Sequence, residues 1–153
     1  DLIPKIVSEL KKMTSKPFCW YIIASTEECL QDMLDKIKKY DVSREVILLG
    51  AKDNPYPYFK KSDLFVCTSV SESFSYVIAE SKVLHVPVLC NNIPVAMEVV
   101  SDEEGWICSI ADMPETLSRI IENNNSIYTK VKGKILNYQY NNHEILKKFE
   151  DIV

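Results

Sequence analysis

The chain has 153 residues, of which 46% are hydrophobic and 26% are charged, a composition that suits one globular domain with a sizeable core. Its net charge of -4 argues against a general nucleic-acid binder or a membrane-surface binder. No apolar run approaches the roughly 20 residues that span a bilayer, and the N-terminus lacks the blocks of a secretory signal.

Short apolar runs alternate with helical periodicities along the whole chain. The run over 18–24 is continuous and rich in aromatic and β-branched residues, which predicts a strand buried on both faces. In chain order we expect a helix over 2–13, a strand over 18–24, a helix around 30–37, a strand over 46–49, a short helix over 58–61, a strand over 64–67, a helix over 76–84, a strand over 86–90, a short helix over 95–100, a strand over 106–109, a helix around 117–121 and a polar helical tail from 127 onward. This alternation predicts a single α/β domain over 1–153, with a Rossmann-like, doubly wound parallel sheet.

The order of the first elements departs from that pattern. The chain opens with a helix, whereas a doubly wound unit opens with the strand at the centre of its sheet. Either that strand lies upstream of Asp1, or its place in the sheet is filled in another way. Because Asp1 is not a natural first residue, we expect a fragment of a longer protein that carries its targeting information elsewhere.

The cysteines indicate a reduced protein. Most of them lie in apolar, strand-like runs, where a free cysteine behaves as a small hydrophobe. They are Cys19, Cys29, Cys67, Cys90 and Cys108, and none forms a CxxC pair or lies at metal-ligand spacing from a histidine. We therefore expect neither a disulfide framework nor a metal site, and a cytoplasmic location.

The segment after the strand over 64–67 carries the most chemistry. Ligands of open α/β sheets bind at the carboxyl ends of the strands. Glu72 falls in the loop at such an end, and Glu80 lies about two turns into the following helix. A carboxylate accepts two hydroxyl hydrogen bonds at once, which suits the diol of a ribose or a sugar.

The start of that helix suits a phosphate group. We expect the helix to start near Phe74, so that its leading N–H groups face the cleft with roughly half a positive charge. The candidate phosphate-binding residues are Ser73, Phe74, Ser75, Tyr76 and Val77, with hydroxyl donors from the two serines. Phe74 and Tyr76 fit a role in packing as well as a ligand contact. Neither a GxGxxG loop nor a P-loop occurs, so the helix terminus is the remaining mode of phosphate binding.

This segment resembles the E-x7-E motif of glycosyltransferase family 4 and related GT-B enzymes, whose usual form is E-G-F-G-L-V-x-x-E-A-M-A-x-G-x-P-V. The matching residues run from Glu72 through Glu80 to Pro87 and Val88. Further similarity covers most of the chain, at 46–50 (V-x-F-L-G), 62–66 (A-D-L-F-V), 94–100 (G-x-x-E-I-V) and from Gly105 to Asp112 (G-x-L-V…D).

The resemblance implies a nucleotide-sugar-binding, C-terminal donor domain of a bacterial, retaining glycosyltransferase. Glu72 would act in catalysis by contacting hydroxyls of the donor sugar, and Glu80 would hold the ribose. The backbone of 74–77 would hold the diphosphate, and Gly50, Ala51 and Lys52 would lie near the nucleobase. The family needs no metal or cofactor, and the whole enzyme would be a hexosyltransferase in polysaccharide biosynthesis.

The departures from the family pattern concern the diphosphate. Serines 73 and 75 replace two glycines, and His85 replaces the glycine of G-x-P. His85 ends a helix, where it suits the C-terminal dipole better than the role of a base. The family's Arg…Lys pair and the N-terminal domain, which binds the glycan or lipid-linked acceptor, lie outside this sequence. We therefore expect weak donor binding and no transfer by this fragment alone, and membrane association, at the inner face, only through the rest of the protein.

Two alternatives remain open. A GT-B-type sugar-nucleotide epimerase would need further acid–base residues, of which the sequence offers no convincing set. A non-catalytic nucleotide-binding or protein-interaction module would tolerate replacement of both Glu72 and Glu80 without effect on any ligand.

Overall fold

The computed structural model describes residues 2–24, 27–72, 75–122, 131 and 134–135. Its elements are α1 (Ile3–Met13), β1 (Trp20–Ile22), α2 (Glu27–Lys39), β2 (Val46–Leu48), α3 (Tyr56–Lys61), β3 (Phe65–Cys67), α4 (Tyr76–Val83), β4 (Val88–Asn91), α5 (Pro94–Val99), β5 (Gly105–Cys108) and α6 (Met113–Glu122). They follow the predicted order, so the α/β class is confirmed. The predicted tail from 127 onward lies almost entirely outside the described residues.

Local sequence explains α1, the first helix. Pro4 stands in the first turn, where its missing N–H costs no intrahelical bond, and Lys11 and Lys12 lie in the last turn. Ile6, Val7 and Leu10 are buried and recur at helical spacing. This helix therefore buries one apolar face and points its charged residues outward.

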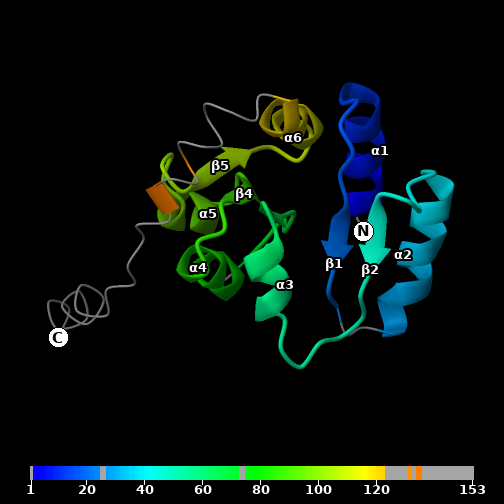
Figure 1. The fold of residues 1–153 in the computed structure, drawn as a ribbon, viewed down its shortest axis with the longest axis horizontal. Helices are drawn as coiled ribbons and strands as arrows, with labels where there is room; N and C mark the ends of the chain where they lie inside the picture. The colour runs from blue at the N-terminus through cyan, green and yellow to red at the C-terminus, as the bar shows by residue number, and fades with distance from the viewer. Residues whose placement is uncertain (1, 25–26, 73–74, 123–130, 132–133, 136–153) are drawn as a thin grey trace, which may run out of the picture.

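The strands form two parallel sheets instead of the predicted single one. One sheet pairs β1 with β2, and the other has the order β3-β4-β5. Among the described residues, no strand lies between β1 and β3. Figure 1 shows the outcome, with α1, α2, β1 and β2 in one half of the molecule and the elements from α3 to α6 in the other.

The prediction that the strand over 18–24 is buried on both faces is wrong. The regular strand covers only Trp20–Ile22, and the side chain of Tyr21 is 55% exposed. β1 is one strand of a two-stranded sheet, so one of its edges has no paired strand among the described elements. By contrast, β4 has strands on both sides, and all four of its residues are buried.

Two helices far apart in the sequence join the halves. α1 and α6 lie side by side and share a core in which Leu10, Leu89 and Met113 are fully buried. Residues in the strands of both sheets or just before them pack against this core: Phe18, Trp20, Leu64, Val66, Trp106 and Cys108. One layer of helices therefore covers the same side of β1 and β3.

Candidate functional site

The loop after β3 is fixed to the end of β4. The amide nitrogen Nδ2 of Asn91 donates to the carbonyl oxygen of Ser69 at 3.0 Å, and Oδ1 of Asn91 accepts from the backbone N–H of Asn92 at 3.0 Å. Asn91 is buried, so both of its polar atoms are satisfied inside the protein. This contact gives the loop a defined start at the carboxyl end of the sheet.

Glu72 extends from that loop at the exposed surface. The hydroxyl of Ser69 donates to Oε1 of Glu72 at 2.8 Å. This bond orients the carboxylate, which still has acceptor capacity for further donors because a carboxylate offers about four lone-pair sites. The structure thus places Glu72 in the loop at the strand end, as predicted.

Glu80 lies on α4 and contacts a residue that the sequence motifs did not indicate. The hydroxyl of Tyr56 donates to Oε1 of Glu80 at 3.2 Å. The pKa of Tyr56 is raised, first because this bond requires the neutral phenol and also because the carboxylate charge opposes ionisation. The sequence feature that could have drawn attention to Tyr56 is its place between Pro55 and Pro57, in the loop that follows the expected nucleobase segment.

A local bond positions Tyr56 at the start of α3. Oδ1 of Asn54 accepts from the backbone N–H of Tyr56 at 3.1 Å, the pattern of an Asx-turn. Pro55 precedes the helix as its N-cap. The loop from β2 is therefore brought against α4, so that residues 24 positions apart meet.

The first turn of α4 agrees with the helix predicted over 76–84 and lies slightly later than the phosphate-binding start expected near Phe74. The helix begins at Tyr76, with Ser75 as its N-cap, and residues 73 and 74 lie outside the described ones. The carbonyl of Ser75 accepts from the N–H groups of Ile78 and Ala79 at 3.1 and 3.3 Å. Tyr76 is 68% exposed and Val77 is 41% exposed, so the start of the helix lies at the surface.

Ser75 itself is buried and has a φ of -88°. That conformation is open to any residue, so the serine in place of a family glycine causes no backbone strain at this position. Its hydroxyl makes no capping bond in α4. The residue that we expected to donate a hydroxyl to phosphate is therefore buried in this structure.

The expected nucleobase segment lies at the carboxyl end of β2. The N–H of Leu49 still bonds to the carbonyl of Ile22 at 2.9 Å, and Gly50 then turns the chain with a φ of 69°. This left-handed conformation favours glycine. Ala51 is exposed and Lys52 is half-buried, on the path toward α3.

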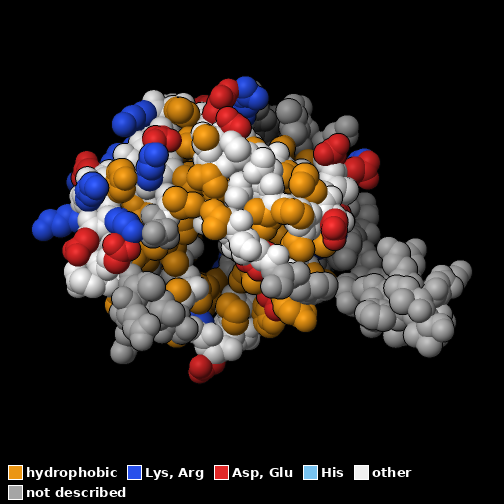
Figure 2. Space-filling model, turned by 180° about the vertical axis from the view of Figure 1, so that it is seen from behind, with side chains coloured by type: hydrophobic (Ala, Val, Ile, Leu, Met, Phe, Trp, Pro, Cys, Tyr) orange, Lys and Arg blue, Asp and Glu red, His pale blue; other side chains and the backbone are white. Residues whose placement is uncertain are grey.

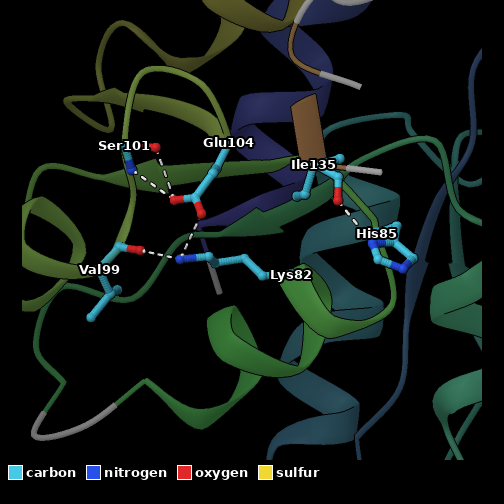
Figure 3. A network of polar contacts seen from close by, with 6 residues as sticks. All are labelled: Lys82, His85, Val99, Ser101, Glu104 and Ile135. Carbon is cyan, nitrogen blue, oxygen red and sulfur yellow. Dashed lines mark hydrogen bonds and ion pairs between the residues drawn. The ribbon is translucent and has the colours of Figure 1, made fainter. Parts of the chain in front are cut away.

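The far end of α4 is anchored by a polar network, shown in Figure 3. Nζ of Lys82 lies 3.0 Å from Oε1 of Glu104 and donates to the carbonyl of Val99 at 2.9 Å. Oε2 of Glu104 accepts from the N–H and the hydroxyl of Ser101 at 3.1 and 3.0 Å. The side chains of Lys82 and Glu104 are only 12% and 17% exposed. This network holds the helix that carries Glu80 against the loop before β5.

His85 follows α4 with a φ of 60°, the left-handed conformation that a glycine would adopt most easily. Nδ1 of its ring lies 2.8 Å from the carbonyl oxygen of Ile135 (Figure 3). His85 therefore closes the helix and binds backbone, at the end of α4 remote from Glu72.

Three cysteines lie on the three strands of the larger sheet. Cys67 of β3 is directly opposite Cys90 of β4, and Cys108 ends β5. The thiol of Cys90 donates to Cys67 and lowers its pKa to about 6, with further support from Ser69. The pKa of Cys90 is raised, by the same bond and then by burial. The described cysteines whose side chains are placed are all free thiols.

Neither a metal cluster nor a membrane span occurs among the described residues. No group of three or more His, Cys, Asp or Glu side chains there is arranged to hold a metal ion. No helix in that part of the chain is long and apolar enough to cross a membrane.

Curated relatives are glycosyltransferases. The O-antigen biosynthesis glycosyltransferase WclY of Escherichia coli is 26% identical over 114 residues, which are 73% of this chain and 31% of that protein. The N-acetylgalactosamine-N,N'-diacetylbacillosaminyl-diphospho-undecaprenol 4-alpha-N-acetylgalactosaminyltransferase of Campylobacter jejuni is 36% identical over 74 residues, or 48% of this chain and 20% of that protein. The chain thus spans a third or less of the length of these relatives.

Solved structures show the same fold. TarM of S. aureus, a mutant crystallised with fondaparinux, alpha-GlcNAc-glycerol and UDP, matches 99% of this chain with a TM-score of 0.83 at 19% identity, over 32% of its own chain. HepE of Anabaena, in complex with UDP and glucose, matches 96% with a TM-score of 0.73 at 16% identity, over 44% of its own chain. The family model of glycosyl transferases group 1 matches residues 1–132. The chain therefore belongs to the glycosyl transferases group 1 family, and it has the α/β fold of GT-B enzymes.

Proposed function

We propose that this chain is the donor-binding domain of a retaining glycosyltransferase that transfers a sugar from a nucleotide-diphosphate sugar to a glycan or glycolipid acceptor. One observation carries the proposal. Glu72 and Glu80 flank the start of α4 at the carboxyl end of β3, the edge at which open α/β sheets bind ligands. Membership of the glycosyl transferases group 1 family supports the same chemistry.

In this proposal Glu80 binds the ribose of the donor. Its carboxylate already accepts one hydroxyl hydrogen bond, from Tyr56, at a half-buried position. A ribose diol offers the same kind of donor, so it replaces or joins the phenol at the two carboxylate oxygens. Gly50, Ala51 and Lys52 lie one loop away from Tyr56, on the side proposed for the nucleobase.

Glu72 contacts hydroxyls of the donor sugar, and the start of α4 holds the diphosphate. The leading N–H groups of any helix have no carbonyl to bond within the helix, and its dipole favours an anion there. As the bond between the sugar and the diphosphate breaks, negative charge grows on the leaving phosphate, next to this helix end. Residues 73 to 77 supply that site in the proposal, mostly through their backbone.

The acceptor and the whole reaction involve more of the protein. The names of the relatives mention O-antigen biosynthesis and a diphospho-undecaprenol substrate, which supports a glycan or lipid-linked acceptor. Because the chain spans 31% of the Escherichia coli relative, we propose that an N-terminal domain outside residues 1–153 binds the acceptor. The fragment then binds donor weakly and transfers nothing by itself, needs no metal or cofactor, and works in the cytoplasm, at the inner membrane face where the acceptor is lipid-linked.

Titration of the protein with UDP, GDP, ADP and their sugars, followed by chemical-shift NMR, tests this proposal. We expect one nucleotide to bind selectively with a Kd of about 1 mM, and Glu80→Ala to weaken it at least about tenfold, since a hydrogen bond to a charged group contributes roughly 1.5–3 kcal/mol. Glu115→Ala, a helical glutamate on α6, is the matched control and keeps the wild-type Kd. Equal binding by Glu80→Ala would refute the site, and no binding by the full-length polypeptide would refute the function.

A further inference from the structure

The bond between Tyr56 and Glu80 leaves acceptor atoms of both side chains open to a ligand. The phenol donates its hydrogen to Oε1 of Glu80 at 3.2 Å, because an ionised carboxylate can only accept. The phenolic oxygen keeps its own acceptor capacity for another donor, on a residue that is 45% exposed. Among the residues that the structure describes, the phenol is the one group that bonds to this carboxylate, so Oε2 is open as well.

Both side chains are held in place by their own elements. Oδ1 of Asn54 accepts from the backbone N–H of Tyr56 at 3.1 Å, which fixes the start of α3. On α4, the ion pair of Lys82 with Glu104 at 3.0 Å ties the helix that carries Glu80 to the loop before β5. The two open acceptors, Oη of Tyr56 and Oε2 of Glu80, are therefore close together before a ligand binds, and this preorganisation lowers the entropic cost of binding.

Few cations compete for this pair of acceptors. Within the described ranges, no lysine or arginine forms an ion pair with Glu80. Figure 2 shows Lys and Arg side chains gathered mainly over the half with α1 and α2, at the left of that view, with few over the rest of the face. A neutral ligand with hydroxyl groups can thus bond to Glu80 without displacing a salt bridge.

We propose that Tyr56 selects for ribose: one hydroxyl of the donor's diol donates to Glu80, and the neighbouring hydroxyl donates to the phenolic oxygen of Tyr56. This inference rests on the proposed function, and it adds to the ribose site a residue that no sequence motif indicated. Two neighbouring acceptors match two hydroxyl donors on adjacent carbon atoms, whereas a single hydroxyl leaves one acceptor unpaired.

The place of Tyr56 in the chain fits this role. It follows the segment 50–52 that we propose for the nucleobase, and it contacts the helix whose start we propose for the diphosphate. Ribose joins the base to the diphosphate in every nucleotide, so it lies between these two positions. The competing possibility is that ribose displaces the phenol from Glu80. Removal of the phenolic hydroxyl would then strengthen nucleotide binding, so the sign of the effect separates the two cases.

Calorimetric titration of the full-length polypeptide tests the proposal. The probes are UDP, GDP and ADP together with their 2′,3′-dideoxy counterparts, which lack both hydroxyls of the diol. Tyr56→Phe removes the phenolic oxygen and keeps the ring. Tyr58→Phe is the matched control, because Tyr58 lies on the same helix and is 41% exposed, and the same atom is deleted there.

We expect Tyr56→Phe to raise the Kd of the ribonucleotide that binds by about two- to tenfold, the range of one neutral hydrogen bond. The Kd of its dideoxy counterpart should not change, and Tyr58→Phe should change neither value. An equal rise for both nucleotides would indicate a general disturbance of the site and would overturn the proposal, as would an unchanged or lower Kd for the ribonucleotide. These outcomes leave the proposed function standing, whereas binding of none of the three ribonucleotides would overturn that function and this proposal together.

Discussion

A methyl group at Gly105 has no room in this fold. Gly105 begins β5 beside β4, and a Cβ built on it would lie 2.2 Å from the carbonyl oxygen of Val88 and 2.6 Å from its Cγ2. A carbon–oxygen contact needs about 3.3 Å, so the two strands would have to separate by about 1 Å. The obstructing atom is backbone, which no rotamer change can move. We therefore expect Gly105→Ala to destabilise the protein by about 3 kcal/mol, the upper end for overpacking.

Gly50→Ala is the matched control. Gly50 has a φ of 69°, but no atom lies within 4 Å of the position that an alanine methyl group would take, so only backbone strain of about 1–2 kcal/mol is expected. In a chain of this size 1 kcal/mol shifts Tm by roughly 2–4 °C, so Gly105→Ala should lower Tm by about 6–12 °C. Thermal unfolding followed by circular dichroism measures both variants. A Gly105→Ala protein as stable as Gly50→Ala would refute the pairing of β4 with β5 at this position.

Three further results are expected. Glu80→Ala removes the carboxylate whose hydrogen bond, and then whose charge, raises the pKa of Tyr56, so this pKa should fall toward 10.0 in an NMR titration; an unchanged value would contradict the contact. Cys90→Ala removes the thiol donor to Cys67, so the pKa of Cys67 should rise above about 6, as read from thiolate absorbance against pH. Because the folded pKa of Cys67 lies below its usual 9.0, the free energy of unfolding of the wild type should rise as the pH increases from 6 to 9. An equal rise in the Cys90→Ala variant would refute the assignment of Cys90 as the donor to Cys67. Lys82→Met leaves the half-buried carboxylate of Glu104 without its cation and should cost about 1–3 kcal/mol in denaturant unfolding, whereas an unshifted midpoint would exclude a stabilising role.

Sequence periodicity determined the elements and their order. The spacing of Ile6, Val7 and Leu10 predicts the buried face of α1, and the apolar run over 86–90 predicts the fully buried strand β4. It also placed Glu72 in the loop after β3 and Glu80 on α4, where the structure has them. Local sequence encodes these features because each depends on residues that are only a few positions apart in the chain.

Only the tertiary structure decided the rest. In the part of the chain that it describes, it showed two sheets in which β1 and β3 do not pair with each other. It also showed the exposed side chain of Tyr21 and the bond between Tyr56 and Glu80, which are 24 positions apart. Whether an apolar strand is buried depends on the neighbours that the whole fold supplies, and a hydrogen bond between two loops or helices depends on how the intervening strands pair. Periodicity along the chain carries neither kind of information, because both are fixed by contacts between segments that are distant in the sequence.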